Sequence, residues 1–151
     1  MSFLLKLIIF GIFLINSLFV FLANSNSSIF KHIECEIKFG NNKSKFLSLD
    51  IADTFEKRSY GLMNREKIET NEGMLFIWED SEIREFWMKN TYFNLDLFFI
   101  NQYGVIVEVY ENAKAFDERK IISKEKVKFV LEMKAGDIKA NVGDNLICSS
   151  N

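Results

Sequence analysis

Two acidic side chains lie inside strongly apolar segments of this chain and are the first candidates for chemistry. Asp96 belongs to the run "LDLFFI", and Glu132 belongs to the run "VLEM". An ionised carboxylate in such surroundings costs several kcal/mol unless a counterion and hydrogen bonds compensate for its lost hydration. We therefore expect each acid to be paired with a cation supplied by another part of the chain.

Three cations in nearby motifs are the expected partners of these acids. Arg58 and Arg65 flank the segment "SYGLMN", and Lys89 follows closely after Trp87. An arginine can hold a carboxylate through two parallel hydrogen bonds, whereas a lysine cannot. Such an internal ion pair is often architectural, because it ties separate elements of a fold together without forming a site.

A binding pocket is the functional interpretation of the same residues. An aromatic plane beside a few placed polar groups is typical of sites that recognise a small molecule or a glycan. We predict non-catalytic recognition of a small molecule, a glycan or a partner protein. The predicted lining is Arg58, Arg65, Trp87, Lys89, Asn90, Asp96 and Glu132.

Two alternatives to binding stay open. In the first, Asp96 and Glu132 form the carboxylate pair of a hydrolase, which requires about 5 to 9.5 Å between them across a cleft and one raised pKa. In the second, the chain is a purely structural envelope protein without a pocket. The sequence supplies two acids but no geometry, so we prefer binding to catalysis.

Metal and cofactor signals are weak. Met63, Met74, Met88 and Met133 fall in the motif segments and suggest a soft-metal site, but no Met-x-x-Met or His-x-Met pattern accompanies them. One histidine and two distant cysteines do not suit zinc. A glycine-rich phosphate loop and a nucleophile elbow are also absent from the sequence. We expect neither a metal nor a cofactor.

The composition indicates one globular domain with a mixed surface charge. The 151 residues are 48% hydrophobic and 15% aromatic, which is enough for a substantial core. The net charge is −2, and lysines and glutamates alternate along the polar segments without a basic cluster. This pattern argues against nucleic-acid binding, which needs a concentrated cationic face.

Residues 1–25 have the pattern of a signal peptide. Lys6 precedes an apolar run over 7–23, and small residues then favour cleavage after Ser25. An uncleaved membrane anchor is the alternative, because the run approaches the length of a spanning helix. Both interpretations place the domain at 26–151 outside the cytoplasm, in the periplasm or secreted, with membrane contact only through an uncleaved segment.

This location bears on the two cysteines. Cys35 and Cys148 could form one disulfide in an oxidising compartment if the terminal strands are neighbours. Two separate buried thiols are the alternative, and we slightly prefer it. The sole histidine, His32, lies on the opposite strand face from Cys35 and is a poor general base for a catalytic thiol.

Short strands must position all of these residues. Asp53 and Glu56 suggest a capping box, which predicts one helix at 54–63, followed later by a long charged loop at 111–126. About eight strands with one helix predict a mainly β domain, a small barrel or sandwich whose helix covers one opening. The predicted strands are 33–39, 45–51, 74–78, 83–90, 95–100, 105–110, 127–134 and 145–149.

Several motifs together resemble the family known as domain of unknown function 192. They are "RSYGLMNR" at 58–65, "GMLF" at 73–76, "FWMKNT" at 86–91, "LD" at 95–96, and "VLE" followed by "AG" at 130–136. The resemblance spans roughly residues 33–148 and implies a small, mainly β domain, often behind an export signal, without implying a reaction. Asn94 stands where this family usually has Pro, and we expect the exchange to loosen that turn.

Overall fold

The computed structural model describes residues 30–149. Within them the chain forms nine strands and one short helix, which confirms the predicted mainly β class. The predicted signal peptide at 1–25 and its cleavage after Ser25 lie outside the described residues. The elements are β1 (Lys31–Lys38), β2 (Ser44–Ala52), α2 (Phe55–Tyr60), β3 (Glu72–Glu82), β4 (Glu85–Phe86), β5 (Leu95–Ile100), β6 (Ile106–Ala113), β7 (Ile121–Ile122), β8 (Val127–Lys134) and β9 (Asn145–Cys148).

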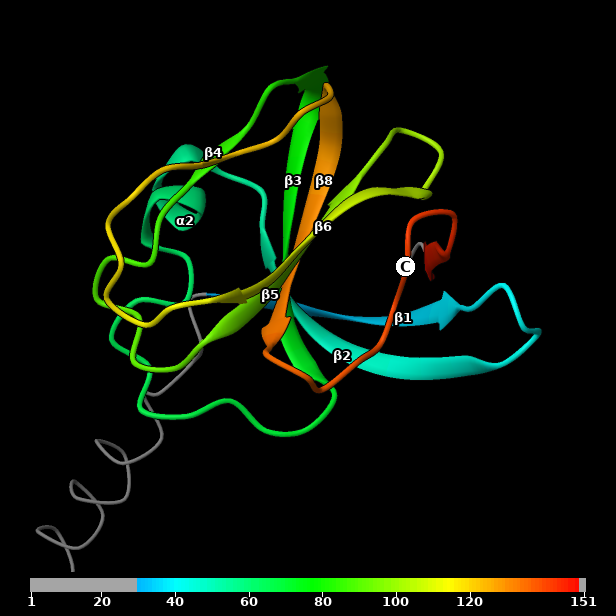
Figure 1. Ribbon diagram of the computed structural model, residues 1–151, viewed down its shortest axis with the longest axis horizontal. Coiled ribbons are helices and arrows are strands. Elements are labelled where there is room, and N and C mark those ends of the chain that lie inside the picture. Colours follow the sequence, from blue (N-terminus) through cyan, green and yellow to red (C-terminus); the bar gives the residue numbers. More distant parts are fainter. Residues whose placement is uncertain (1–29, 150–151) are drawn as a thin grey trace, which may run out of the picture.

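Seven strands form one sheet in the order β6-β5-β8-β3-β2-β1-β9, and β4 pairs with β7 in a second, small sheet. The large sheet curls into a half-barrel (Figure 1), and its two edges meet where Val105 bridges Asn145. All neighbours in it are antiparallel except β2 and β3, which are parallel. Parallel strands need a crossover connection, so the segment between β2 and β3 must leave the sheet, and this segment carries α2.

Each face of the large sheet has its own apolar core, because successive strand residues point to opposite faces. The core inside the curl takes buried side chains from all seven strands, including Leu49, Leu75 and Leu131. The core on the other face packs beneath the crossover segment and the β4–β7 sheet, and it includes Met74 and Phe76. Figure 1 shows α2 and β4 on one side of β3, with β1 and β2 on the other.

The glycine of "GMLF" is required by close strand packing. A Cβ added at Gly73 would lie 2.4 Å from the Met133 sulfur and 2.5 Å from the Glu132 carbonyl oxygen. Real Cβ atoms do not approach a backbone oxygen this closely. The glycine therefore sets how near β3 comes to β8, the strand that carries one of the two candidate acids.

The helix is shorter than predicted and is capped differently. Its N-cap is Thr54, whose hydroxyl accepts a hydrogen bond from the Lys57 N–H, so the prediction of Asp53 as the cap is wrong. Gly61 ends the helix at a φ of 54° and donates its N–H to the Lys57 carbonyl. No helical residue is buried, and Phe55 is 74% exposed. The helix thus presents no core face.

Two strand predictions were also wrong in extent. The predicted strand at 83–90 keeps only Glu85–Phe86 as β4, because the segment after it turns at Asn90, where φ is 50°. The predicted loop at 111–126 contains β7, which supplies the partner of β4. Both pieces are two residues long, too short to give a periodic signal in the sequence.

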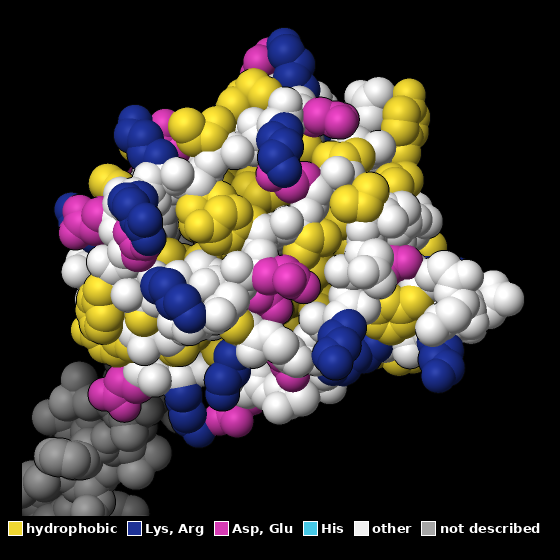
Figure 2. All heavy atoms as spheres, in the orientation of Figure 1, with side chains coloured by type: hydrophobic (Ala, Val, Ile, Leu, Met, Phe, Trp, Pro, Cys, Tyr) yellow, Lys and Arg dark blue, Asp and Glu magenta, His cyan; other side chains and the backbone are white. Residues whose placement is uncertain are grey.

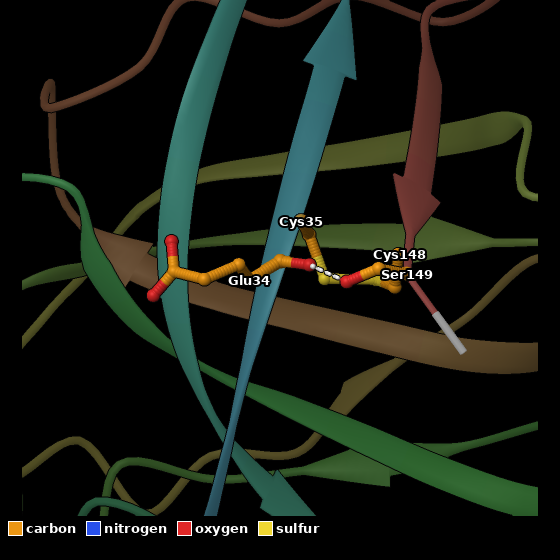
Figure 3. The surroundings of a disulfide bond; sticks show 4 residues. All are labelled: Glu34, Cys35, Cys148 and Ser149. Atoms are coloured by element: carbon orange, nitrogen blue, oxygen red, sulfur yellow. Dashed lines mark hydrogen bonds between the residues drawn. A yellow bond between two sulfur atoms is a disulfide. The ribbon is translucent and has the colours of Figure 1, made fainter. Parts of the chain in front are cut away.

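The terminal strands β1 and β9 are neighbours, and a disulfide joins them. Cys35 and Cys148 lie directly opposite each other in the register, with an S–S distance of 2.04 Å. Figure 3 shows the bridge beside the hydroxyl of Ser149, which donates to the Glu34 carbonyl oxygen at 3.3 Å. The preference for separate thiols is therefore wrong, and the bridged alternative is the one that the structure has.

The surface mixes both signs of charge. Figure 2 shows Lys and Arg side chains interspersed with Asp and Glu side chains over the visible face. Within residues 30–149 no helix combines the length and apolar character that a bilayer crossing requires.

Candidate ligand-binding site

A pocket of about 350 Å³ opens between the crossover segment and the face of the sheet beneath it. This volume is within the usual range for small-ligand sites. Aromatic side chains from α2, β3 and the β4 segment form much of its wall. They are Phe55, Tyr60, Phe76, Trp78, Phe86 and Trp87.

Three of the wall aromatics, Phe76, Trp78 and Phe86, contact one another. Phe86 contacts Phe76 edge-to-face, with ring centroids 5.0 Å apart, and Trp78 edge-to-face at 6.2 Å. Phe86 also reaches Phe99 in the core below at 6.1 Å. This packing holds β4 against β3, so this part of the pocket wall belongs to the core, whereas Phe55, Tyr60 and Trp87 are exposed.

Glu132 of β8 lines this pocket beneath the aromatic wall. Its side chain is buried, with 4% exposure, and its carboxyl forms no hydrogen bond or ion pair with any residue of the described chain. Burial raises the pKa of Glu132 to about 8, although the charge of Arg65 acts in the opposite direction. The carboxyl is therefore mostly protonated and neutral at pH 7, which makes it a hydrogen-bond donor.

Arg65 does not pair with Glu132 because it forms an ion pair with Asp50. Its guanidinium donates to the buried Asp50 carboxylate at 2.5 Å, and His32 Nδ1 lies 3.0 Å from the other Asp50 oxygen. Asp50, Met74 and Glu132 are in register across β2, β3 and β8. The two acids thus share a face, about 10 Å apart, since neighbouring strands are spaced by about 4.8 Å.

Asp96 lies on the opposite face of the sheet from Glu132. In the β5–β8 register Asp96 is opposite Met133, and Leu97 is opposite Glu132. Neighbouring residues of a strand point to opposite faces, so the two acids do not meet across a cleft. Asp96 and Glu132 therefore do not form the predicted carboxylate pair.

Backbone N–H groups, rather than a cation, stabilise the Asp96 carboxylate. One oxygen accepts from the N–H of Asn112 at 2.7 Å, and the other accepts from the N–H of Gly136 at 2.8 Å. Asn112 lies at an irregularity in the β5–β6 pairing, where φ is 57°. Asp96 therefore binds the N–H group at this bulge, and its predicted ion pair is wrong.

The remaining predicted cations lie against indole rings. Arg58 lines the pocket and donates through one nitrogen, Nη1, to the carbonyl oxygens of Asp53 at 2.7 Å and Ile77 at 2.8 Å. Its guanidinium carbon lies 5.3 Å from the Trp78 ring centroid. Lys89 does not line the pocket, and its ammonium lies 5.2 Å from the ring of Trp87.

Asn90 and Asn64 join two of the sequence motifs. The Asn90 carbonyl accepts from the Asn64 N–H at 2.8 Å, and both residues have positive φ, a conformation that Asn tolerates well. This contact links the end of "GLMN" to the end of "WMKN" beside the pocket. The side-chain oxygen of Asn94 accepts a hydrogen bond from the Ala115 N–H at 3.0 Å. Proline has no side-chain acceptor and could not form this bond at the turn.

The structure thus brings together only part of the predicted site. Of the predicted lining, Arg58, Trp87 and Glu132 reach the pocket, whereas Arg65, Lys89, Asn90 and Asp96 do not. Asp50 was not among the predicted residues, although this acid lies in an apolar strand segment just as Asp96 does. The pocket role of Trp78 and Phe76, which the spacing of two in "MLFIW" places on one face with Met74, was not predicted either.

Metal-ligating side chains do not gather here. Within the described part of the chain, no three His, Cys, Asp or Glu residues come together as a metal ion would require. The site is an aromatic pocket with a neutral acid beneath it and an arginine in its wall.

Two solved structures have a similar fold. A solved structure from Sinorhizobium meliloti 1021, described as a proposed transcription regulator, matches with a TM-score of 0.77 and 33% identity, over 79% of this chain and 95% of that one. A protein of unknown function from Novosphingobium aromaticivorans DSM 12444 matches with a TM-score of 0.73 and 25% identity, over 80% of this chain and 88% of that one. No curated protein matches the chain.

The sequence itself matches the family model described as DUF192, an uncharacterized ACR, over residues 37–147. This range contains the pocket lining and every motif of the resemblance. The chain therefore belongs to the DUF192 family.

Proposed function

We propose that this domain binds a small molecule, reversibly and without catalysis, in the pocket above Glu132. The observation that carries the proposal is a buried carboxyl that lines a pocket of ligand size and has no hydrogen-bond partner among the described residues. Buried polar groups in folded proteins are nearly always hydrogen-bonded. A ligand that reaches Glu132 would supply the bond that the described chain does not.

The pocket wall supports binding rather than reaction. It offers an aromatic surface for an apolar ligand body, whereas Asp96, the acid that the hydrolase hypothesis pairs with Glu132, lies on the other face of the sheet. Glu85, the other acid of the lining, lies 3.0 Å from Lys120. The Asp50 carboxylate on the same face is already bound to Arg65.

We also propose that the domain works outside the cytoplasm. The disulfide between β1 and β9 supports this location, because such bonds persist in oxidising compartments and are rare in the cytosol. The proposal does not include nucleic-acid binding, since the chain has a net charge of −2 and a surface of mixed sign.

The test is a thermal-shift screen of a diverse small-molecule library against the wild-type domain and two variants. Trp87→Ala removes a pocket wall residue that is 46% exposed, so the fold should survive its loss. Tyr103→Ala is the matched control, because Tyr103 is 79% exposed and lies outside the pocket lining.

A ligand of this pocket should raise Tm in the wild type and the control but much less in Trp87→Ala. At a free concentration of about 100 times Kd, the expected stabilisation is about 2.7 kcal/mol. If every hit stabilises Trp87→Ala as strongly as the control, the ligands bind elsewhere and the proposed function is wrong.

A further inference from the structure

An unpaired buried carboxyl can meet two kinds of ligand. If it is ionised, it recognises a cation, and if it is protonated, it donates a hydrogen bond to an acceptor oxygen. Which of these the pocket takes depends on the groups around it. The class of small molecule that the pocket binds is a further question, and its answer rests on the proposed function.

The two indole rings of the pocket already have cations from the chain itself. Arg58 and Arg84 place their guanidinium carbons 5.3 Å and 4.4 Å from the Trp78 ring centroid. Lys89 places its ammonium 5.2 Å from the ring of Trp87. A cationic ligand that used either indole ring for cation–π contact would meet like charge there.

The polar groups of the pocket are mostly donors. Arg58 uses only Nη1 in hydrogen bonds with described residues, so Nε and Nη2 remain for a ligand. Ser59 contributes a hydroxyl, and the indole N–H groups of Trp78 and Trp87 donate to no described residue. Glu85, which also lines the pocket, lies 3.0 Å from Lys120. An acceptor ligand finds more partners here than a donor does.

Burial, rather than neighbouring charge, keeps the Glu132 carboxyl in the donor form. On its own face of the sheet, Arg65 is neutralised by Asp50, with His32 beside that acid. From the crossover segment and β4, the charged groups of the pocket lining are Arg58 and Glu85. Desolvation outweighs the effect of Arg65 and raises the pKa of Glu132 to about 8.

We propose that the ligand is a small molecule with an apolar body and an acceptor oxygen, a carboxylate or a carbonyl, which accepts a hydrogen bond from the neutral Glu132 carboxyl. The aromatic wall holds the apolar body, and the free nitrogens of Arg58 favour a carboxylate over an amide carbonyl. Binding is therefore linked to proton retention. The affinity is full where Glu132 is protonated and falls as the pH rises past the pKa of that group.

The test uses three probes of similar shape: phenylacetate, phenylacetamide and 2-phenylethylamine. The chain has two tryptophans, and both line the pocket, so their indole N–H signals in ¹H–¹⁵N NMR report on this site directly. Each probe is titrated into the full-length domain at pH 6 and pH 9.

Phenylacetate and phenylacetamide should shift both indole signals at pH 6 and bind about tenfold more weakly at pH 9, because about a tenth of Glu132 stays protonated there. Glu132→Gln keeps an N–H donor that does not titrate, so this variant should bind both probes equally at the two pH values. Glu85→Gln is the matched control and should keep the pH dependence of the wild type.

Two results separate failure of the ligand class from failure of the function. If 2-phenylethylamine binds more tightly than the acceptor probes, gains affinity with rising pH and loses it in Glu132→Gln, the pocket takes cations. The proposed binding function is then supported, but the inferred class of ligand is wrong. If no probe and no thermal-shift hit moves either indole signal, the pocket binds no ligand, and both the proposed function and the inference fall.

Discussion

Replacing Glu132 by glutamine should make the domain more stable at neutral pH. The carboxyl has an ordinary pKa of 4.5 and a pKa of about 8 in the fold, because burial penalises its charged form. Glutamine has nearly the same shape as the protonated acid and never ionises. The variant therefore keeps the packing of the neutral side chain. It also removes the cost of burying a carboxylate, which the wild type meets as the pH rises.

The sign and size of the effect follow from linkage. Between pH 4.5 and about 8 the folded state holds a proton that the unfolded state has released, so a rising pH favours unfolding. Over this range the free energy of unfolding of the wild type falls by about 1.4 kcal/mol per pH unit. Glu132→Gln should match the wild type near pH 4 and exceed it by about 3 kcal/mol at pH 7 and about 5 kcal/mol above pH 8.

Urea unfolding at each pH from 4 to 9 measures this difference, since other titrating groups cancel between the two proteins. Glu118→Gln is the control, because Glu118 is exposed and its loss removes a charge without relieving burial. Stability curves for wild type and Glu132→Gln that run parallel over this pH range would refute the reasoning, because Glu132 would then ionise as readily in the fold as in water.

Three further predictions concern the scaffold. Replacing Cys35 and Cys148 by alanine should lower the free energy of unfolding by about 3 to 5 kcal/mol, since the bridge closes a loop with a sequence separation of 113 residues, and urea midpoints with and without reductant check this. Asp96→Asn should cost about 2 kcal/mol by placing an amide against a backbone N–H, while both indole signals stay unchanged because Asp96 lies on the far face. Gly73→Ala should cost about 3 kcal/mol by forcing β3 away from β8, with a lower urea midpoint than the wild type.

The sequence was sufficient for the class of fold, because most strands have local signals. Alternating apolar residues mark β1 and β2, and wholly apolar runs mark β3 and β5, each bounded by turn residues. The short strands β4 and β7 have no such signal, since two residues cannot show a period. Their pairing depends on a contact between segments that are distant along the chain.

The partners of the acids could not be predicted for the same reason. Alternation places Asp96 with Phe98 and Glu132 with Val130, but only the β5–β8 register shows that the two acids point to opposite faces. In the same way, the choice of Asp50 by Arg65 depends on the path of the crossover segment. The local alternation of residues shows which side chains share a face of one strand. Which acid meets which cation depends on the register between strands that are distant along the chain.

The pocket and its unpaired acid have one common origin in the parallel β2–β3 pair. A parallel pair requires the chain to cross over a face of the sheet, and here the crossover provides both α2 for the pocket wall and Arg65 for the Asp50 carboxylate. Arg65 forms an ion pair with Asp50 on β2, so its charge is largely balanced there. It therefore does too little to stabilise an ionised carboxylate at Glu132, two strands away. The same connection that covers this face therefore leaves one carboxyl neutral and unpartnered beneath it. This common origin supports our proposal that Glu132 belongs to a binding site.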